Sequence, residues 1–213
     1  MIVDIPPPRD EPELLARAKA LVGKTLSALG GSEVGLHTKG KAGTLLERAL
    51  GATGGSSATW DFPELRVELK SIPVDGNGKP KESTYVCTFA IAEADTATWE
   101  SSWAAHKLAR VLFVPLWDIG DGDRRIGAPI LWSPNDEEAA TLRADFDEIV
   151  GRIGALGIES VSAHLGEALQ LRPKAASGSV KTVVRSTEGD LVATVPRGFY
   201  LRPSFTAKIL ARG

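Results

Sequence analysis

Apolar residues recur at helical spacing in four segments of the chain. The first is expected to begin with a capping box formed by Asp10 and Glu13 and to end at Gly23. The others cover about residues 43–50, 136–157 and 203–211. The positions that carry the spacing are Leu14, Leu15, Ala18, Leu21 and Val22, then Leu45 and Leu46, then Leu142, Phe146, Ile149 and Ile153, and finally Phe205, Ile209 and Leu210.

Between the second and third of these helices the pattern changes to strands. From Glu64 the period is two, with Leu65, Val67 and Leu69 on one side and Arg66, Glu68 and Lys70 on the other. This alternation predicts a half-buried strand with a charged face. Apolar runs at residues 84–91 and 109–116 predict strands at the centre of a sheet, and shorter strands are expected at 168–172, 191–195 and 198–201.

Composition restricts the class of protein. A chain of 213 residues that is 43% hydrophobic and 24% charged is typical of a globular protein, arranged as one domain or as one domain split into two lobes. The sequence contains neither a long apolar span nor a signal peptide, which predicts a cytoplasmic protein without a membrane anchor. The single cysteine, Cys87, excludes a disulfide framework and is expected to be a buried, inert thiol.

The net charge bears on nucleic-acid binding. A formal charge of -2 and a pI near 6.0 argue against a protein that grips nucleic acid by charge alone, because Lys and Arg contacts to phosphate dominate non-specific affinity. Carboxylates that hold metal ions lower the net charge, however, while basic residues can still line one cleft. The balance therefore favours weak or conditional DNA binding.

Asp61, Glu68 and Lys70 form the most informative group of polar residues. Asp61 precedes the predicted strand, while Glu68 and Lys70 lie two residues apart on one face of it. Carboxylates that converge from a turn and a strand can hold Mg²⁺, which prefers oxygen ligands. A lysine beside them can position the attacking water and balance charge on a phosphate.

The pattern alone leaves a second interpretation open, namely a solvent-exposed strand with alternating charges. Two features favour the interpretation of these residues as the metal site of a nuclease. Glu47 lies on the preceding amphipathic helix and is expected to project toward the same centre, and basic residues are distributed around the apolar scaffold. These basic residues are Lys39, Lys41, Lys107, Arg172 and Lys174.

Longer motifs then add a family resemblance. The segments KGKAGTLLERALG, DFPELRVELKSIPVDGNGKPKESTYVC, TWESSWAAHKLARVLFVP, RRIGAPILWSPNDEE, LQLRPKA and VPRGFYL follow one another in the order seen in the MutH family. The chain therefore resembles the MutH endonucleases of methyl-directed DNA mismatch repair, within the PD-(D/E)xK nuclease superfamily. VELKSIPVD and PRGFYL are far more specific than the bare nuclease motif.

The resemblance implies a fold and an activity. The fold would be α/β, with a mixed central sheet flanked by helices, restriction-endonuclease-like, and residues 1–213 would form a single endonuclease domain with two lobes around a DNA cleft. The activity would be Mg²⁺-dependent nicking of the unmethylated strand of double-stranded DNA at hemimethylated GATC sites, with Mn²⁺ able to substitute. The resemblance also implies a monomer stimulated by MutL, with MutS acting upstream.

Specific residues carry these expectations. By position in the motifs, the resemblance implies that Glu47, Asp61, Glu68 and Lys70 form the catalytic set. Metal ligands would be Asp61, Glu68 and the carbonyl of Leu69. Residues implied in DNA binding are Lys39 and Lys107 at the DNA-facing site, and Arg172, Pro173 and Tyr200 in reading the sequence or its methylation.

Two alternatives remain at this point. One is a type II restriction endonuclease of the same superfamily that cuts GATC on both strands; the absence of a second domain or a clear dimer seam in the sequence disfavours it. The other is a DNA-binding module that has lost catalysis. The presence of Glu47, Asp61, Glu68 and Lys70 argues against that alternative.

Overall fold

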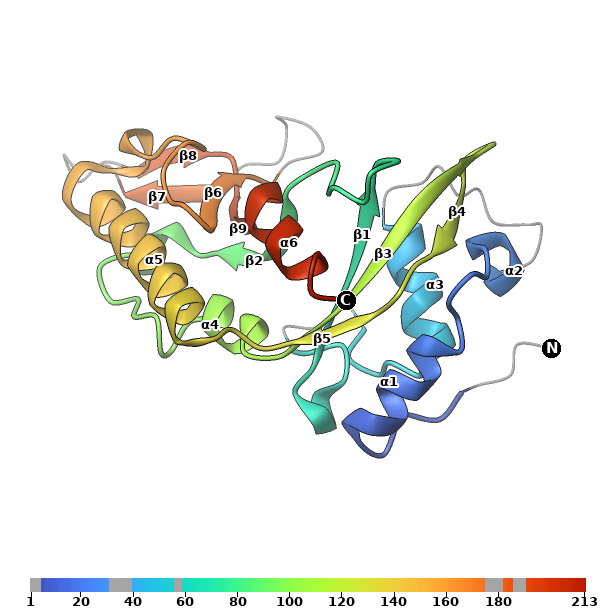
Figure 1. Cartoon of the computed structure of the whole chain (residues 1–213). Coiled ribbons are helices and arrows are strands. Elements are labelled where there is room, and N and C mark those ends of the chain that lie inside the picture. The colour runs from blue at the N-terminus through green and yellow to red at the C-terminus, as the bar shows by residue number, and fades with distance from the viewer. Residues whose placement is uncertain (1–4, 31–39, 56–58, 175–181, 186–190) are drawn as a thin grey trace. The chain divides into compact units, whose positions relative to one another are not determined.

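The computed structural model describes residues 5–30, 40–55, 59–174, 182–185 and 191–213 (Figure 1). The chain forms two compact units. Unit 1 comprises Met1–Glu82, Ala109–Ser133 and Thr206–Gly213, and unit 2 comprises Ser83–Leu108 and Pro134–Phe205. Helices and mixed sheets occur together, so the predicted α/β class is confirmed.

Unit 1 is built on a mixed sheet of four strands. Its central strand β3 (Val111–Gly120) pairs in parallel with β1 (Glu68–Val74), and in antiparallel with β4 (Asp123–Ile126) and β5 (Ile130–Trp132). The β1–β3 register sets Glu68 opposite Val111. Strand β3 is apolar and buried over its first six residues, as expected of a strand with neighbours on both sides.

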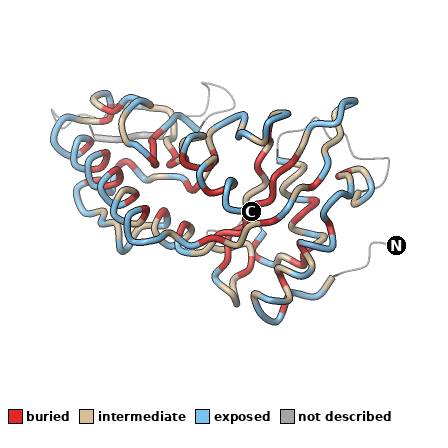
Figure 2. The backbone as a smooth tube through the Cα atoms, in the orientation of Figure 1, coloured by how far each residue is buried: buried red, intermediate tan, exposed pale blue. Residues whose placement is uncertain are grey.

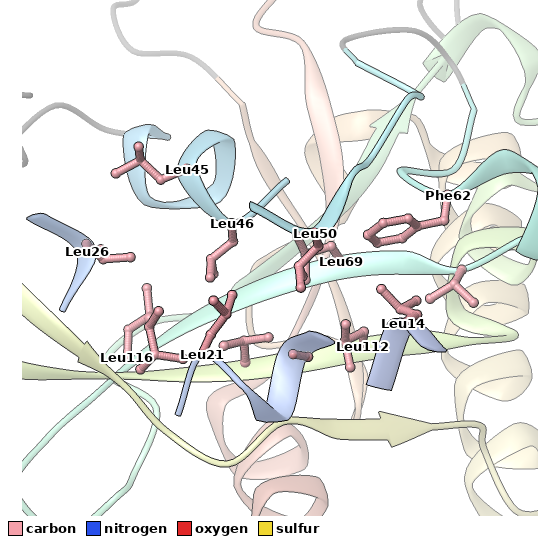
Figure 3. Close-up of a cluster of buried hydrophobic side chains, with 14 residues drawn as sticks. Leu14, Leu21, Leu26, Leu45, Leu46, Leu50, Phe62, Leu69, Leu112 and Leu116 are labelled. Carbon is pink, nitrogen blue, oxygen red and sulfur yellow. The ribbon is translucent and has the colours of Figure 1, made fainter. Parts of the chain in front are cut away.

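Helices of unit 1 cover one face of this sheet. They are α1 (Glu11–Lys19), α2 (Leu26–Gly30) and α3 (Lys41–Leu50), and a short 3₁₀ helix, η1 (Pro63–Leu65), precedes β1. Their leucines form one buried cluster with leucines of β1 and β3 (Figure 3). This packing fixes α3 against β1, the two elements that carry the candidate catalytic residues.

Unit 2 contains a three-stranded antiparallel sheet in the order β2-β9-β6 and a two-stranded sheet of β7 and β8. The bounds are β2 (Thr84–Phe89), β6 (Leu169–Pro173), β7 (Thr182–Arg185), β8 (Leu191–Thr194) and β9 (Arg197–Leu201). Its helical elements are η2 (Ile91–Glu93), α4 (Trp103–Leu108), α5 (Asp136–Leu156) and η3 (Ile158–Ser160). Helix α6 (Pro203–Leu210) begins in unit 2 and ends in unit 1.

The two faces of the β2-β9-β6 sheet differ in chemistry. On one face Phe146 of α5 meets Phe199 and Phe89, with ring centroids 5.2 and 6.4 Å apart. Buried and exposed positions alternate around α5, and the buried, apolar side of this helix packs against the sheet (Figure 2). The other face carries polar and aromatic residues. A bulge in β2 between Tyr85 and Cys87 leaves Tyr85 and Thr88 together on this polar face, their hydroxyl oxygens 2.9 Å apart.

The turn that leads into β6 is held by two charged side chains. Asp145 of α5 is buried and accepts the N–H groups of Glu167, Ala168 and Leu169 at 2.6–2.8 Å. Arg202 donates to the carbonyls of Ala163, Leu165 and Gly166, and its own N–H donates to the carbonyl of Ala168. Backbone donors and acceptors of this turn are thereby satisfied, which fixes where β6 begins.

Much of the predicted secondary structure is confirmed. Helix α5 begins at Asp136, its N-cap residue Asn135 forms a complete capping box with Glu138, and Leu142, Phe146, Ile149 and Ile153 are buried. Cys87 is buried as expected. In α1 the Asp10 carboxylate accepts the Glu13 N–H, but the Glu13 carboxylate reaches the N–H of Arg9, so the predicted capping box is only half formed.

Several predicted boundaries are wrong. Strand β3 continues to Gly120, beyond the predicted end at residue 116. Strand β1 begins at Glu68 and not at Glu64, because Pro63 starts a 3₁₀ turn and Arg66 has a left-handed φ of 53°. Phe62 and Val67 exchange backbone hydrogen bonds across this turn. Helix α1 ends at Lys19 and not at Gly23, because residues 20–23 form tight turns. There Gly23 has a φ of 82° and donates its N–H to Ile126 of β4.

Within the residues that the structure describes, no helix combines the length and the hydropathy needed to cross a lipid bilayer.

Candidate active site

Asp61 is hydrogen-bonded to the edge of β1 that faces away from β3. Its Oδ2 accepts the backbone N–H of Leu69 at 2.7 Å. Because Glu68 donates its own N–H to Arg110 beside β3, the backbone groups of Leu69 point the opposite way, toward Asp61. The carbonyl of Leu69 leaves the strand on the same side as its N–H. This geometry agrees with the ligand role that the resemblance implies for that carbonyl.

Glu68 and Lys70 form an ion pair on one face of β1. The distance from Lys70 Nζ to Glu68 Oε1 is 2.7 Å. The Glu68 side chain is 3% exposed and the Lys70 side chain is 16% exposed. A carboxylate this deeply buried is costly unless it has a charged or hydrogen-bonding partner. The alternative of a solvent-exposed charged strand is therefore wrong, since the charged face of β1 is largely buried.

Glu47 approaches from α3. Leu45, Leu46 and Leu50 bury one side of this helix, and Glu47 lies on the side that faces β1. A Cβ atom placed on Gly43 would lie 3.7 Å from Glu47 Oε1 and 3.9 Å from Ser71 Oγ, so the carboxylate end is near β1. Burial raises the pKa of Glu47 above 4.5, and the nearby charge of Asp61 raises it further. Lys70 acts in the opposite direction, and Glu68 adds a smaller repulsion.

This raised pKa predicts how stability depends on pH. Below 4.5 the Glu47 carboxyl is protonated in both the folded and the unfolded chain and contributes no pH dependence. Above 4.5 the unfolded chain releases the proton first, so ionisation of Glu47 lowers the free energy of unfolding until the pH passes the folded-state pKa. Without added metal, Glu47→Gln should therefore raise Tm near neutral pH, and the gain should shrink toward pH 4.5.

The measurement is a series of thermal melts across this pH range in the presence of a chelator. Glu64→Gln is the matched control, because Glu64 is an exposed carboxylate just before β1. If the Tm difference between Glu47→Gln and the wild type were the same at every pH, the raised pKa of Glu47 would be contradicted.

The donor set fits a hard divalent cation. Glu47, Asp61 and Glu68 supply only carboxylate oxygens, and Leu69 adds a carbonyl oxygen. The pKa of Glu47 is raised chiefly by burial and further by the charges of Asp61 and Glu68, and a cation would relieve this last contribution. Across the described ranges no three His, Cys, Asp or Glu side chains already converge at metal-binding distance. Two of these carboxylates are held by protein donors instead, Glu68 by Lys70 and Asp61 by Leu69.

The residues expected to read DNA lie in unit 2. Arg172 and Pro173 are exposed at the end of β6, and the Arg172 guanidinium lies 5.9 Å from the ring centroid of Tyr200 on β9. Lys107 is partly exposed on α4. Lys39 lies outside the described residues. The structure thus brings Glu47, Asp61, Glu68 and Lys70 together in unit 1, and Arg172 and Tyr200 together in unit 2.

Sequence reasoning missed two neighbours of Arg172. Ser83 Oγ lies 3.0 Å from Arg172 Nη1 and 2.7 Å from Gln170 Nε2. Gln170 is 4% exposed. The alternation in LQLR places Gln170 and Arg172 on one face and could have indicated a polar partner. Ser83 precedes a different strand, so no local pattern connects it to Arg172.

Comparisons with known proteins show what the whole chain is similar to. The family model for the DNA mismatch repair enzyme MutH matches residues 50–145. The DNA mismatch repair protein MutH of Pectobacterium atrosepticum is 47% identical over 216 residues, covering 96% of this chain and 93% of that protein. The corresponding proteins of Serratia proteamaculans and Escherichia coli K12 are each 45% identical over 97% of this chain, which spans 95% and 94% of their respective lengths.

Proposed function

The chain belongs to the MutH family of DNA mismatch repair endonucleases, and we propose from this that it nicks the unmethylated strand of hemimethylated GATC sites in a Mg²⁺-dependent, MutL-stimulated reaction. The observation that carries the proposal is the proximity of Glu47, Asp61, Glu68 and Lys70 in unit 1: the charges of the last three act on the Glu47 carboxyl, and Glu68 pairs with Lys70. A DNA-binding module that had lost catalysis would have no need of this costly group of charges, in which Glu68 is buried and the other three are partly buried.

The hydrolytic roles follow from the positions of these residues. Asp61, Glu68 and the Leu69 carbonyl would hold Mg²⁺, or Mn²⁺ in its place, and the ion would supply activation of water and charge stabilisation on the phosphate. Asp61 is pre-aligned by the Leu69 N–H. Lys70 provides a cation that can move from Glu68 to the reacting phosphate, since both are acceptors for its ammonium group. Glu47 adds the remaining carboxylate beside the other two.

The proposal is tested with supercoiled plasmids that carry GATC sites in unmethylated, hemimethylated and fully methylated form. We expect nicked circles from hemimethylated DNA, with only the unmethylated strand cut, and little product from fully methylated DNA. MutL should raise the rate most at higher salt, because a protein of net charge -2 holds DNA weakly by charge alone. Linear product at equal rates with and without MutL would point to a restriction endonuclease instead.

Arg172 and Tyr200 are proposed to read the site. The planar guanidinium can meet O6 and N7 of guanine together, a contact that contributes about 1–3 kcal/mol of discrimination. We therefore expect Arg172→Ala to lower kcat/KM on the cognate site by about 10- to 100-fold and to relax sequence choice. Tyr200→Ala should mainly narrow the difference between unmethylated and methylated DNA.

Both variants are compared on duplexes that differ in one base pair or one N6-methyl group. Pro173, exposed beside Arg172, is proposed to abut the same base edges. Lys39 and Lys107 are proposed to contact the DNA backbone. If both Arg172→Ala and Tyr200→Ala kept the wild-type preferences for sequence and methylation, this surface would not be the one that reads the site.

A further inference from the structure

The side chain of Ser83 lies at the centre of a small polar network on the exposed face of the β2-β9-β6 sheet. Its Oγ receives a hydrogen bond from Gln170 Nε2 at 2.7 Å and one from Arg172 Nη1 at 3.0 Å. Gln170 is buried, whereas Ser83 is partly exposed and Arg172 is exposed. Ser83 therefore lies where the interior of this face meets its surface.

These two bonds set the polarity of the Ser83 hydroxyl. A serine hydroxyl has two lone pairs and one O–H, and normally acts as acceptor or donor as its neighbours require. Here the guanidinium of Arg172 can only donate, and the amide N–H of Gln170 donates as well. Both lone pairs of Oγ are thus occupied, so the hydroxyl can form a further bond only by donating its hydrogen.

The surroundings make DNA the natural recipient of that hydrogen. Among the described residues no acceptor is bonded to the Ser83 O–H. The adjacent Arg172 guanidinium lies 5.9 Å from the Tyr200 ring, and Lys174 Nζ lies 4.7 Å from the Tyr85 ring on the same face. A surface of cations and aromatic rings attracts a ligand rich in acceptor atoms, and both phosphates and guanine edges are of this kind.

We propose that Ser83 is a further specificity-determining residue, whose hydroxyl is fixed as a donor by Gln170 and Arg172 and donates to an acceptor atom of DNA beside the group bound by Arg172. This inference rests on the proposed function, because it requires Arg172 to face DNA. It adds a directional contact that the arginine fork alone does not supply. A recipient on a base edge and one on a phosphate share the same acceptor chemistry.

The test compares Ser83→Ala with Ser83→Thr, which keeps a hydroxyl at the same position. Thr141→Ala is the matched control, because the Thr141 hydroxyl donates to the Glu137 carbonyl within α5. We expect Ser83→Ala to lower kcat/KM on the cognate duplex about tenfold, equal to about 1.4 kcal/mol. Ser83→Thr and Thr141→Ala should stay close to wild type, and all three proteins should melt together.

Analogue duplexes then locate the acceptor. The base-edge arm uses 7-deazaguanine and 7-deazaadenine, which lack N7, and the phosphate arm uses single methylphosphonates in the site. On the duplex that lacks the atom to which Ser83 donates, the kcat/KM of the wild type should fall toward that of Ser83→Ala. The kcat/KM of Ser83→Ala itself should fall little further on that duplex. A non-additive loss in either arm supports the proposal and identifies the source.

Two results would overturn it. One is a Ser83→Ala variant with wild-type kcat/KM and selectivity, and the other is a loss that is fully additive with every analogue. A wild-type protein that shows no sequence-selective nicking would count against the proposed function itself, and it is recognised before any Ser83 variant is compared.

Discussion

Glu68→Gln should reduce the rate of DNA nicking at least about a thousandfold while the protein stays folded. The substitution removes the negative charge that would hold the cation but keeps the size of the side chain and an oxygen that can accept from Lys70. Asp61→Asn should have a comparable effect. Its amide oxygen can still accept the Leu69 N–H, so the turn before β1 is kept while a charged ligand is lost.

Lys70→Met separates catalysis from metal binding. Lys70 is the cation that pairs with Glu68, so its removal should abolish nicking yet leave divalent-ion affinity equal or higher. Affinity is measured by calorimetric titration with Mn²⁺, and nicking on supercoiled plasmid. Glu64→Gln is the matched control, since Glu64 is exposed in the same segment. Full activity in any one of the three site variants would remove that residue from the catalytic set.

EDTA should abolish nicking completely, and Mg²⁺ or Mn²⁺ should restore it. Ca²⁺ should support DNA binding with little turnover, because it occupies carboxylate sites but adopts looser coordination around the activated water. A readout independent of activity is the melting temperature. At a concentration of about 100 times Kd, a bound ion stabilises the folded state by about 2.7 kcal/mol.

This metal-induced shift in Tm should occur in the wild type and be lost in both Glu68→Gln and Asp61→Asn. The Glu47 carboxylate adds to the expected shift in Tm, because burial and, to a lesser degree, the charges of Asp61 and Glu68 raise its pKa, and a nearby cation favours its ionised form. Nicking that persists in EDTA would overturn the metal-dependent mechanism, whatever the Tm data show.

Local sequence patterns predicted those parts of the fold that local chemistry determines. The capped start of α5 and its buried stripe follow from residues within one helix, so they could be predicted without a structure. The start of β1 could not. An alternating pattern continues through Leu65 and Val67, but Pro63 and the left-handed Arg66 form a turn that the hydrophobic period does not register.

The candidate site could likewise be predicted from the sequence only in part. Glu68 and Lys70 are two residues apart on one strand, so their pairing could be anticipated from the period of the strand alone. Whether they face solvent or the interior depends on how other elements pack around β1, and the sequence left both options open. Ser83 and Arg172 are far apart in the sequence and belong to the two outer strand regions of the order β2-β9-β6, so their side-chain hydrogen bond depends on the folded sheet and not on a local pattern.

The order in which the chain is synthesised determines when the candidate site can form. Residues 47–70 contain the whole candidate cutting set, yet the strand that pairs along β1 is β3, which follows later in the chain (Val111–Gly120), and unit 1 also includes Thr206–Gly213. Since compact units generally fold as wholes, a nascent chain on the ribosome would carry these carboxylates long before it could arrange them. Because segments of the two units alternate along the chain, we expect the candidate site to form only after synthesis has passed through unit 2 and supplied residues Thr206–Gly213.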